Sequence, residues 1–250
     1  MIEGVLRHDI EMEIERQYVD SHGQSEVAFA FCQLLGFALL PRLKRISSQR
    51  LFLPGAGGAS TYANLSGILT RPIDWELIEQ QYDEVVRYTT AMAERTADPE
   101  AILRRFTRNN VQHPTYKALA ELGKAAKTLF LCRYLASEPL RREIHEGLNV
   151  VETWNSANGF IFFGKGGEVA SNWLEDQEIS VHALHLLQSC LVYINTLMLQ
   201  RVLADPAWMA RMTPADRRGL TPLVWGHVSP YGACDLDMVR RLDLDLREAA

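Results

Sequence analysis

Two acidic residues far apart in the sequence could together hold a divalent metal ion. Asp20 ends a predicted strand over residues 11–20, and Glu152 lies on a predicted helix over residues 148–162. A carboxylate at the carboxyl end of a strand lies where open α/β sheets bind ligands. Carboxylates that share divalent ions serve phosphodiester chemistry. The structural alternatives are a turn or helix cap at Asp20 and a solvated helix face at Glu152.

The neighbours of these two residues are small and polar. Asn155 follows Glu152 at helical spacing, together with Ser156 and Gly159, so a backbone or a phosphate could approach this face. His22 stands two positions after Asp20 and is an accessory candidate.

Basic residues form three local groups that could neutralise DNA phosphates. Lys165 lies in a glycine-rich turn just after the Glu152 helix, where backbone could meet a phosphate. The alternative for each residue is a solvated basic surface. The remaining candidates follow the second predicted strand or precede two asparagines: Arg42, Lys44, Arg45 and Arg50, then Arg104, Arg105 and Arg108.

Composition indicates one large globular domain or two small ones. The 250 residues are 47% hydrophobic and 23% charged, and the net charge of −5 gives no overall basic signature. A DNA-binding role must therefore depend on local clusters. The four cysteines form no CxxC pair, which argues against a zinc site. No signal peptide or long apolar run is evident, so we expect a cytoplasmic protein.

The pattern along the chain predicts an α/β beginning followed by many helices. A strand over residues 11–20, a helix over 23–35 and a strand over 37–40 form the first unit. Residues 54–70 are rich in glycine and predict a loop. Helices are predicted after Asp74 and Asp98, over 114–136 and after Pro139, and a strongly amphipathic helix over 179–204. The tail after Pro206 is predicted to be irregular.

A colinear set of segments covers nearly the whole chain and is more specific than any short motif. These segments resemble, in order, the C-terminal catalytic region of the Tn3-family transposases, which are DDE enzymes. They are QYVDSHGQSEVAFAFCQLLGF (17–37), PRLKRI (41–46), LTRPIDWELIEQQYDE (69–84), LRRFTRNNVQHPTYKALAELGKAAKTLFLCRYL (103–135), REIHEGLNVVETWNSANGFIFFGKGGEVASN (142–172), LLQSCLVYINTLMLQ (186–200) and HVSPYG (227–232).

The resemblance implies an α/β, RNase H-like catalytic core that is helix-dominated overall. Asp20 would be the second and Glu152 the third acidic residue of the DDE triad. The expected organisation is a partial core over 1–50, a mostly helical insertion over 51–140, core helices over 141–205 and a tail over 206–250. The strands that carry the first aspartate are expected to be missing, which makes the core incomplete.

The resemblance also implies Mg²⁺ or Mn²⁺ as cofactor and transposon-end and target DNA as partners. Self-association, or association with full-length transposase, is expected as well. Because three carboxylates are needed to hold two ions, the isolated chain is expected to be inactive. Two alternatives remain. One is a non-catalytic remnant that binds DNA or full-length transposase, and the other is an unrelated helical interaction protein.

Overall fold

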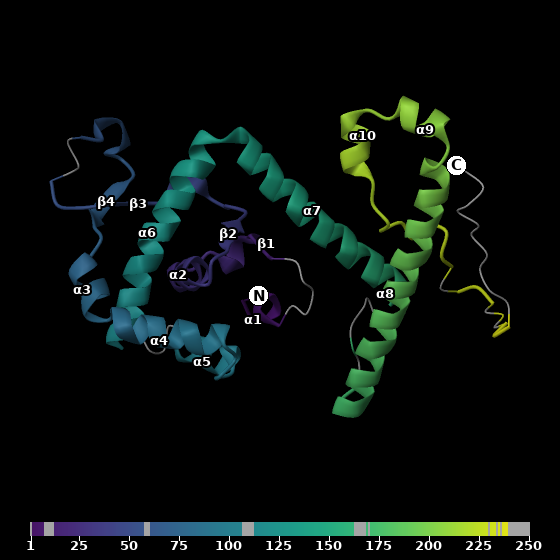
Figure 1. Cartoon of the computed structure of the whole chain (residues 1–250), viewed down its shortest axis with the longest axis horizontal. Helices are drawn as coiled ribbons and strands as arrows, with labels where there is room; N and C mark the ends of the chain where they lie inside the picture. The colour runs from purple at the N-terminus through teal and green to yellow at the C-terminus, as the bar shows by residue number, and fades with distance from the viewer. Residues whose placement is uncertain are drawn as a thin grey trace. The chain divides into compact units, whose positions relative to one another are not determined.

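The computed structural model describes most of the chain and divides it into two compact units. The described residues are 2–7, 13–57, 61–106, 113–162, 169, 171–229, 231–233, 235 and 237–239. The units are Met1–Leu148 and Asn149–Ala250, and each is described by itself. Figure 1 shows that helices dominate both units.

The first unit begins with the predicted strand, helix and strand. Strands β1 (Arg16–Val19) and β2 (Ala38–Pro41) pair in parallel, with Val19 opposite Pro41. Helix α2 (Glu26–Leu34) connects them, and the Ser25 side chain caps it by accepting from the Ala28 N–H. Gly36, at φ +88°, turns the chain out of the helix. Of the strand predicted over 11–20, the described residues 13–15 and Asp20 lie outside β1, and residues 11 and 12 lie outside the described part of the structure.

The core of this unit lies between α2 and α6 (Pro114–Ala136), which pack against each other (Figure 1). Phe31 and Leu119 are fully buried there. The two helices approach so closely at Gly123 that a Cβ on this residue would lie 1.8 Å from the Glu26 carbonyl oxygen. A glycine is therefore required at this crossing.

The sequence analysis did not predict the second parallel pair, β3 (Leu51–Leu53) with β4 (Leu69–Pro72). Strand β3 ends just before the loop predicted over residues 54–70, and β4 begins inside it. Strands of three and four residues are too short to show an alternating pattern, and a register shift interrupts the pair. Short 3-10 turns, η2 (Ile46–Ser48) and η3 (Ala63–Leu65), lie near them.

Further short helices lie in the first unit. They are α1 (Ile2–Leu6), α3 (Trp75–Gln80), α4 (Tyr82–Ala93) and α5 (Pro99–Arg105). Asp74 caps α3 and Asp98 caps α5, each by accepting from a backbone N–H, as predicted. The helix expected after Asp74 is interrupted at Gln81, which separates α3 from α4.

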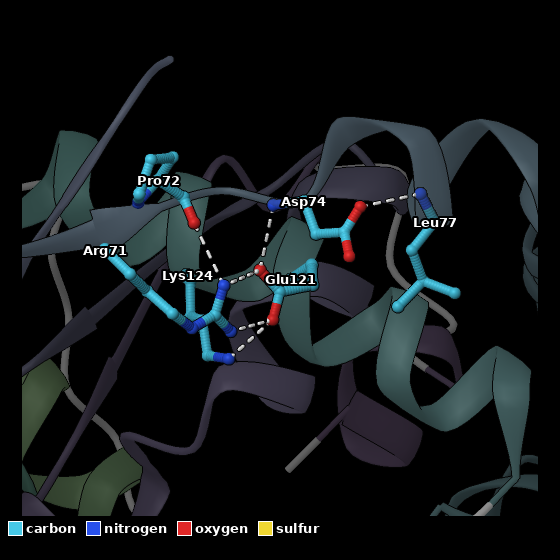
Figure 2. Close-up of polar contacts among 6 residues, drawn as sticks. All are labelled: Arg71, Pro72, Asp74, Leu77, Glu121 and Lys124. Atoms are coloured by element: carbon cyan, nitrogen blue, oxygen red, sulfur yellow. Dashed lines mark hydrogen bonds and ion pairs between the residues drawn. The ribbon is translucent and has the colours of Figure 1, made fainter. Parts of the chain in front are cut away.

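A buried carboxylate holds β4 and α3 against α6. Glu121, 5% exposed, accepts hydrogen bonds from Lys124 Nζ at 2.7 Å and from the Asp74 N–H at 3.1 Å. Arg71 binds both carboxylate oxygens (Figure 2). Burial by itself raises the pKa of Glu121, but the hydrogen bonds from Arg71, Lys124 and Asp74 outweigh it and lower the pKa to about 2. The sequence analysis missed this cluster.

The second unit contains the end of α7 (Glu138–Ile161) and helices α8 (Leu174–Leu203), α9 (Pro206–Arg211) and α10 (Pro214–Gly219). The prediction of an irregular tail after Pro206 is wrong, because two short helices form there. Asp205 and Thr213 cap them, and a proline follows each cap at the first helical position. These two prolines therefore begin helices.

Helix α8 has the predicted position but not the predicted single apolar face. Leu191 is buried, whereas Leu187, Ile194 and Met198 are exposed within this unit. Apolar side chains lie on several sides of the helix, so one packing face cannot cover them all. By length and composition alone, α8 is apolar enough to cross a membrane, with a mean hydropathy of 1.2, although its prediction was of a packed helix. One such helix is weak evidence for a membrane protein.

Candidate catalytic site

Asp20 lies directly after β1, at the carboxyl edge of the β1–β2 pair, as the sequence predicted. Arg42 follows β2, and its backbone N–H donates to the Val19 carbonyl at 2.9 Å. Parallel strands end at the same edge, so Asp20 and Arg42 leave the sheet side by side. The Asp20 side chain is exposed, and Arg42 is half-buried. A carboxylate and a guanidinium therefore stand at one sheet edge, where a phosphate could reach both.

A tight turn holds the backbone after Asp20. The 3-10 turn η1 (Ser21–Gly23) begins there, and the Gly23 N–H donates to the Asp20 carbonyl at 3.2 Å. A Cβ on Gly23 would lie 2.8 Å from Val19, so this turn leaves room only for glycine. His22 lies in the same turn, but its side chain is outside the described part of the structure.

The segment after β2 presents basic side chains from an unusual backbone. Lys44 and Arg45 are exposed. Arg45 has φ 55° and ψ 59°, a left-handed conformation that costs a residue with a side chain on the order of 1–2 kcal/mol. Such strain is often found at functional sites. Lys44 and Arg45 follow Arg42 by two and three positions in the sequence. This basic segment therefore begins at the edge of the β1–β2 pair.

Glu152 lies on α7, as predicted, and its side chain is exposed in the second unit, as is that of Asn155. The neighbouring hydroxyls bond to the helix itself. Ser156 Oγ donates to the Glu152 carbonyl at 2.9 Å, and Thr153 Oγ1 donates to the Asn149 carbonyl at 2.8 Å. The polar face that the sequence predicted is therefore present beside Glu152.

Asp20 belongs to the first unit and Glu152 to the second. Among the residues that the structure describes, no group of three histidine, cysteine, aspartate or glutamate side chains could hold a metal ion. The predicted DNA contacts Arg108 and Lys165 lie outside the described residues. The two exposed carboxylates are hard oxygen donors of the kind that Mg²⁺ or Mn²⁺ binds.

Sequence reasoning missed a polar cluster that links β1 to α7. Glu143 accepts a hydrogen bond from Tyr18 Oη at 2.7 Å and forms an ion pair with Arg16. The Arg16 hydrogen bond, followed by that of Tyr18, lowers the pKa of Glu143. Desolvation, with the Glu143 hydrogen bond, raises the pKa of Tyr18. Arg16, Tyr18 and Asp20 alternate in the sequence, and this alternation was the available signal.

A sheet-edge aspartate beside basic residues, with a glutamate on a later helix, is typical of metal-dependent enzymes that act on phosphodiesters. Comparison with family models is more specific. The model of the Tn3 transposase DDE domain matches residues 1–233, so the chain belongs to this family. Membership implies an RNase H-like catalytic fold and, in general, the use of divalent metal.

Curated relatives agree with this assignment. The transposase for transposon Tn1546 of Enterococcus faecium is 30% identical over 232 residues, which are 93% of this chain and 23% of that protein. The transposase for transposon Tn501 of Pseudomonas aeruginosa is 30% identical over 97% of this chain and 24% of its own length. The transposase for transposon Tn3926 of Escherichia coli is 31% identical over 93% of this chain and 23% of its own length. The chain thus spans about a quarter of the length of these relatives.

Proposed function

We propose that this chain is part of an enzyme of DNA transposition, in which metal-dependent strand cleavage and strand transfer occur at transposon ends. The observation that carries the proposal is Asp20, exposed at the carboxyl edge of a parallel pair beside Arg42. The family assignment supports it, as do the relatives, which are named as transposases.

Asp20 and Glu152 would be metal ligands for Mg²⁺ or Mn²⁺. When bound, such ions lower the pKa of an attacking water and neutralise charge on the phosphate. Two carboxylates leave one ion of a two-ion site poorly held, so the proposal includes a third carboxylate in addition to this pair. His22 and Asn155 are accessory candidates, because they stand beside the two ligands in the sequence.

Arg42, Lys44 and Arg45 would bind backbone phosphates next to Asp20. A cation held at the sheet edge both orients the phosphate and offsets the charge that the carboxylates bring. Lys165 and Arg108 are proposed as further phosphate contacts from their sequence context. DNA is therefore the proposed partner, together with further copies of the transposase.

A non-catalytic role is the second candidate. The observation that favours it is that the basic side chains of Lys44 and Arg45 are exposed after β2. In that role the basic segment after β2 would bind DNA, or the chain would associate with full-length transposase, without strand cleavage.

Metal-dependent nicking of transposon-end DNA tests the proposal. This chain and a longer version with upstream sequence would be compared with and without Mg²⁺ or Mn²⁺. We expect cleavage by the longer version and its loss in Asp20→Ala and Glu152→Ala. Glu15→Ala and Glu146→Ala remove exposed carboxylates near each ligand and should leave cleavage unchanged. If both Asp20→Ala and Glu152→Ala still cleave DNA, the two residues are not the metal ligands. If this chain and its longer version bind DNA but neither cleaves it, the non-catalytic role is favoured.

A further inference from the structure

The turn that carries Asp20 is fixed at its first end by the β1–β2 pair. The Arg42 N–H donates to the Val19 carbonyl at 2.9 Å, directly before Asp20. The turn η1 follows Asp20, and helix α2 begins soon afterwards, at Glu26. The position of the exposed Asp20 carboxylate therefore depends also on what holds the second end of this short segment.

A half-buried lysine of α6 holds the second end. Lys127 Nζ donates to the Gln24 carbonyl at 3.3 Å and forms an ion pair with Glu26 at 3.6 Å. The lysine side chain is only 14% exposed. Hydrogen bonds from a charged donor are stronger than those between neutral groups. The ammonium group thus binds both the residue that follows η1 and the first residue of α2.

The backbone of α6 contacts the same segment one helical turn before Lys127. A Cβ on Gly123 would lie 1.8 Å from the Glu26 carbonyl oxygen. Because Gly123 and Lys127 are four positions apart, they lie on the same face of α6. The close crossing at Gly123 sets how near α6 comes to the start of α2, and Lys127 binds the chain just before that point.

We propose that Lys127 is a positioning residue, which acts through the Gln24 carbonyl to hold the turn that carries Asp20. The turn lies between two bound carbonyls, those of Val19 and Gln24, and the Gly23 N–H closes it by donating to the Asp20 carbonyl at 3.2 Å. With both ends bound, the Asp20 carboxylate keeps its place at the sheet edge. All of these residues belong to the first unit. The inference rests on the proposed function only for its consequence in DNA cleavage.

Amide hydrogen exchange tests this role without using activity. In the full chain, the exchange rate of the Gly23 N–H, followed by nuclear magnetic resonance, reports local opening of the turn. Lys127→Met and the more polar Lys127→Gln both remove the charged donor. We expect Lys127→Met to speed the exchange of Gly23 about tenfold, because one charge-assisted hydrogen bond is lost. Lys127→Arg keeps a charged donor and should restore most of the protection.

Two controls separate this role from general stability. Lys117→Met removes an exposed lysine of the same helix and should leave the exchange of Gly23 unchanged. Glu121→Gln weakens the contact of α6 with β4 and α3, so it should lower the free energy of unfolding without opening the turn. Unchanged exchange in Lys127→Met and Lys127→Gln, in protein that urea unfolding shows to be folded, would overturn the positioning role. Equal acceleration by Glu121→Gln would also overturn it, because any loss of stability in the unit would then suffice.

Single-turnover cleavage gives the second readout and separates the two proposals. In the longer version of the protein, Lys127→Met should slow the nicking of transposon-end DNA about tenfold, because Asp20 is less often in place. Its affinity for DNA should stay unchanged, and Lys127→Arg should restore the rate. If Asp20→Ala cleaves as fast as the parent, the proposed function fails, while the exchange measurement still decides whether Lys127 holds the turn. If Asp20→Ala abolishes cleavage but Lys127→Met cleaves normally, the positioning role fails alone.

Discussion

Among individual residues, Glu121 shows how a buried carboxylate can hold three elements together. Its oxygens accept from Arg71, Lys124 and the Asp74 N–H, and removal of one partner from such a cluster leaves the others unsatisfied. Nothing in the sequence around position 121 distinguishes it from an exposed helix glutamate. Two of its partners, Arg71 and Asp74, lie 50 and 47 positions away, so only the tertiary fold identifies it.

We predict that Glu121→Gln lowers the free energy of unfolding by about 2 kcal/mol at neutral pH. Since its folded pKa of about 2 lies below the ordinary value of 4.5, the carboxylate stabilises the fold fully above about pH 4.5. This contribution declines as pH falls and is lost as pH passes through about 2. Urea unfolding of both proteins between pH 7 and pH 3 measures the difference.

The control for this prediction is Glu138→Gln, which removes an exposed pair with Arg142. Exposed pairs contribute at most about 1 kcal/mol, so its effect should be small at every pH. A difference for Glu121→Gln that does not shrink at low pH would contradict the role of the charged carboxylate.

The strained backbone at Arg45 gives a second prediction at the scale of the residue. Arg45→Gly should stabilise the fold by about 1 kcal/mol, because glycine adopts a positive φ without strain. The same change should weaken DNA binding, because one phosphate contact is lost. The slope of the logarithm of the DNA-binding constant against the logarithm of the salt concentration should decrease in magnitude by about one. Thermal unfolding and binding titrations over a range of salt concentrations measure the two effects.

Arg95 provides a matched comparison, because it is a second arginine at positive φ, 57°, far in sequence from the sheet edge. Arg95→Gly should leave the affinity for DNA and its salt dependence unchanged. If both glycine variants bind DNA equally well as the parent, the basic segment after β2 is not a DNA contact.

Among the secondary-structure elements, the crossing of α2 over α6 decides the stability of the first unit. Gly123→Ala should lower the free energy of unfolding by about 3 kcal/mol or more, because its Cβ would collide with rigid backbone. Gly4→Ala, in helix α1 with open space around it, should be neutral or stabilising by up to about 1 kcal/mol. Urea unfolding compares the two variants, and a mild effect of Gly123→Ala would mean that the helices can separate without cost.

The elements also show how far the sequence could predict the fold. Caps at Asp74 and Asp98, the helix over 114–136 and the parallel pair that frames Asp20 were all recognisable from local patterns. The β3–β4 pair was not, since its strands are too short to show a period. The contact of Glu143 could not be recognised from its own surroundings either, because its partner Tyr18 lies 125 positions away.

At the scale of the whole molecule, the central claim joins residues from two separately described units. The family assignment identifies the chain as a Tn3 transposase DDE domain that spans about a quarter of its relatives' length. The proposed metal ligands come from both units, Asp20 from the first and Glu152 from the second. The DNA-binding segment after β2 would lie at the same sheet edge.

Metal-directed cleavage of the protein backbone tests this claim most directly. Fe²⁺ that replaces Mg²⁺ reduces added hydrogen peroxide to a hydroxide ion and a hydroxyl radical and is itself oxidised to Fe³⁺. The radical cuts the chain close to the bound ion. In the longer version of the protein we predict cuts near both Asp20 and Glu152, competed by Mg²⁺ and lost at both places in either Asp20→Ala or Glu152→Ala. Cuts near one residue that persist when the other is replaced would contradict a shared metal site.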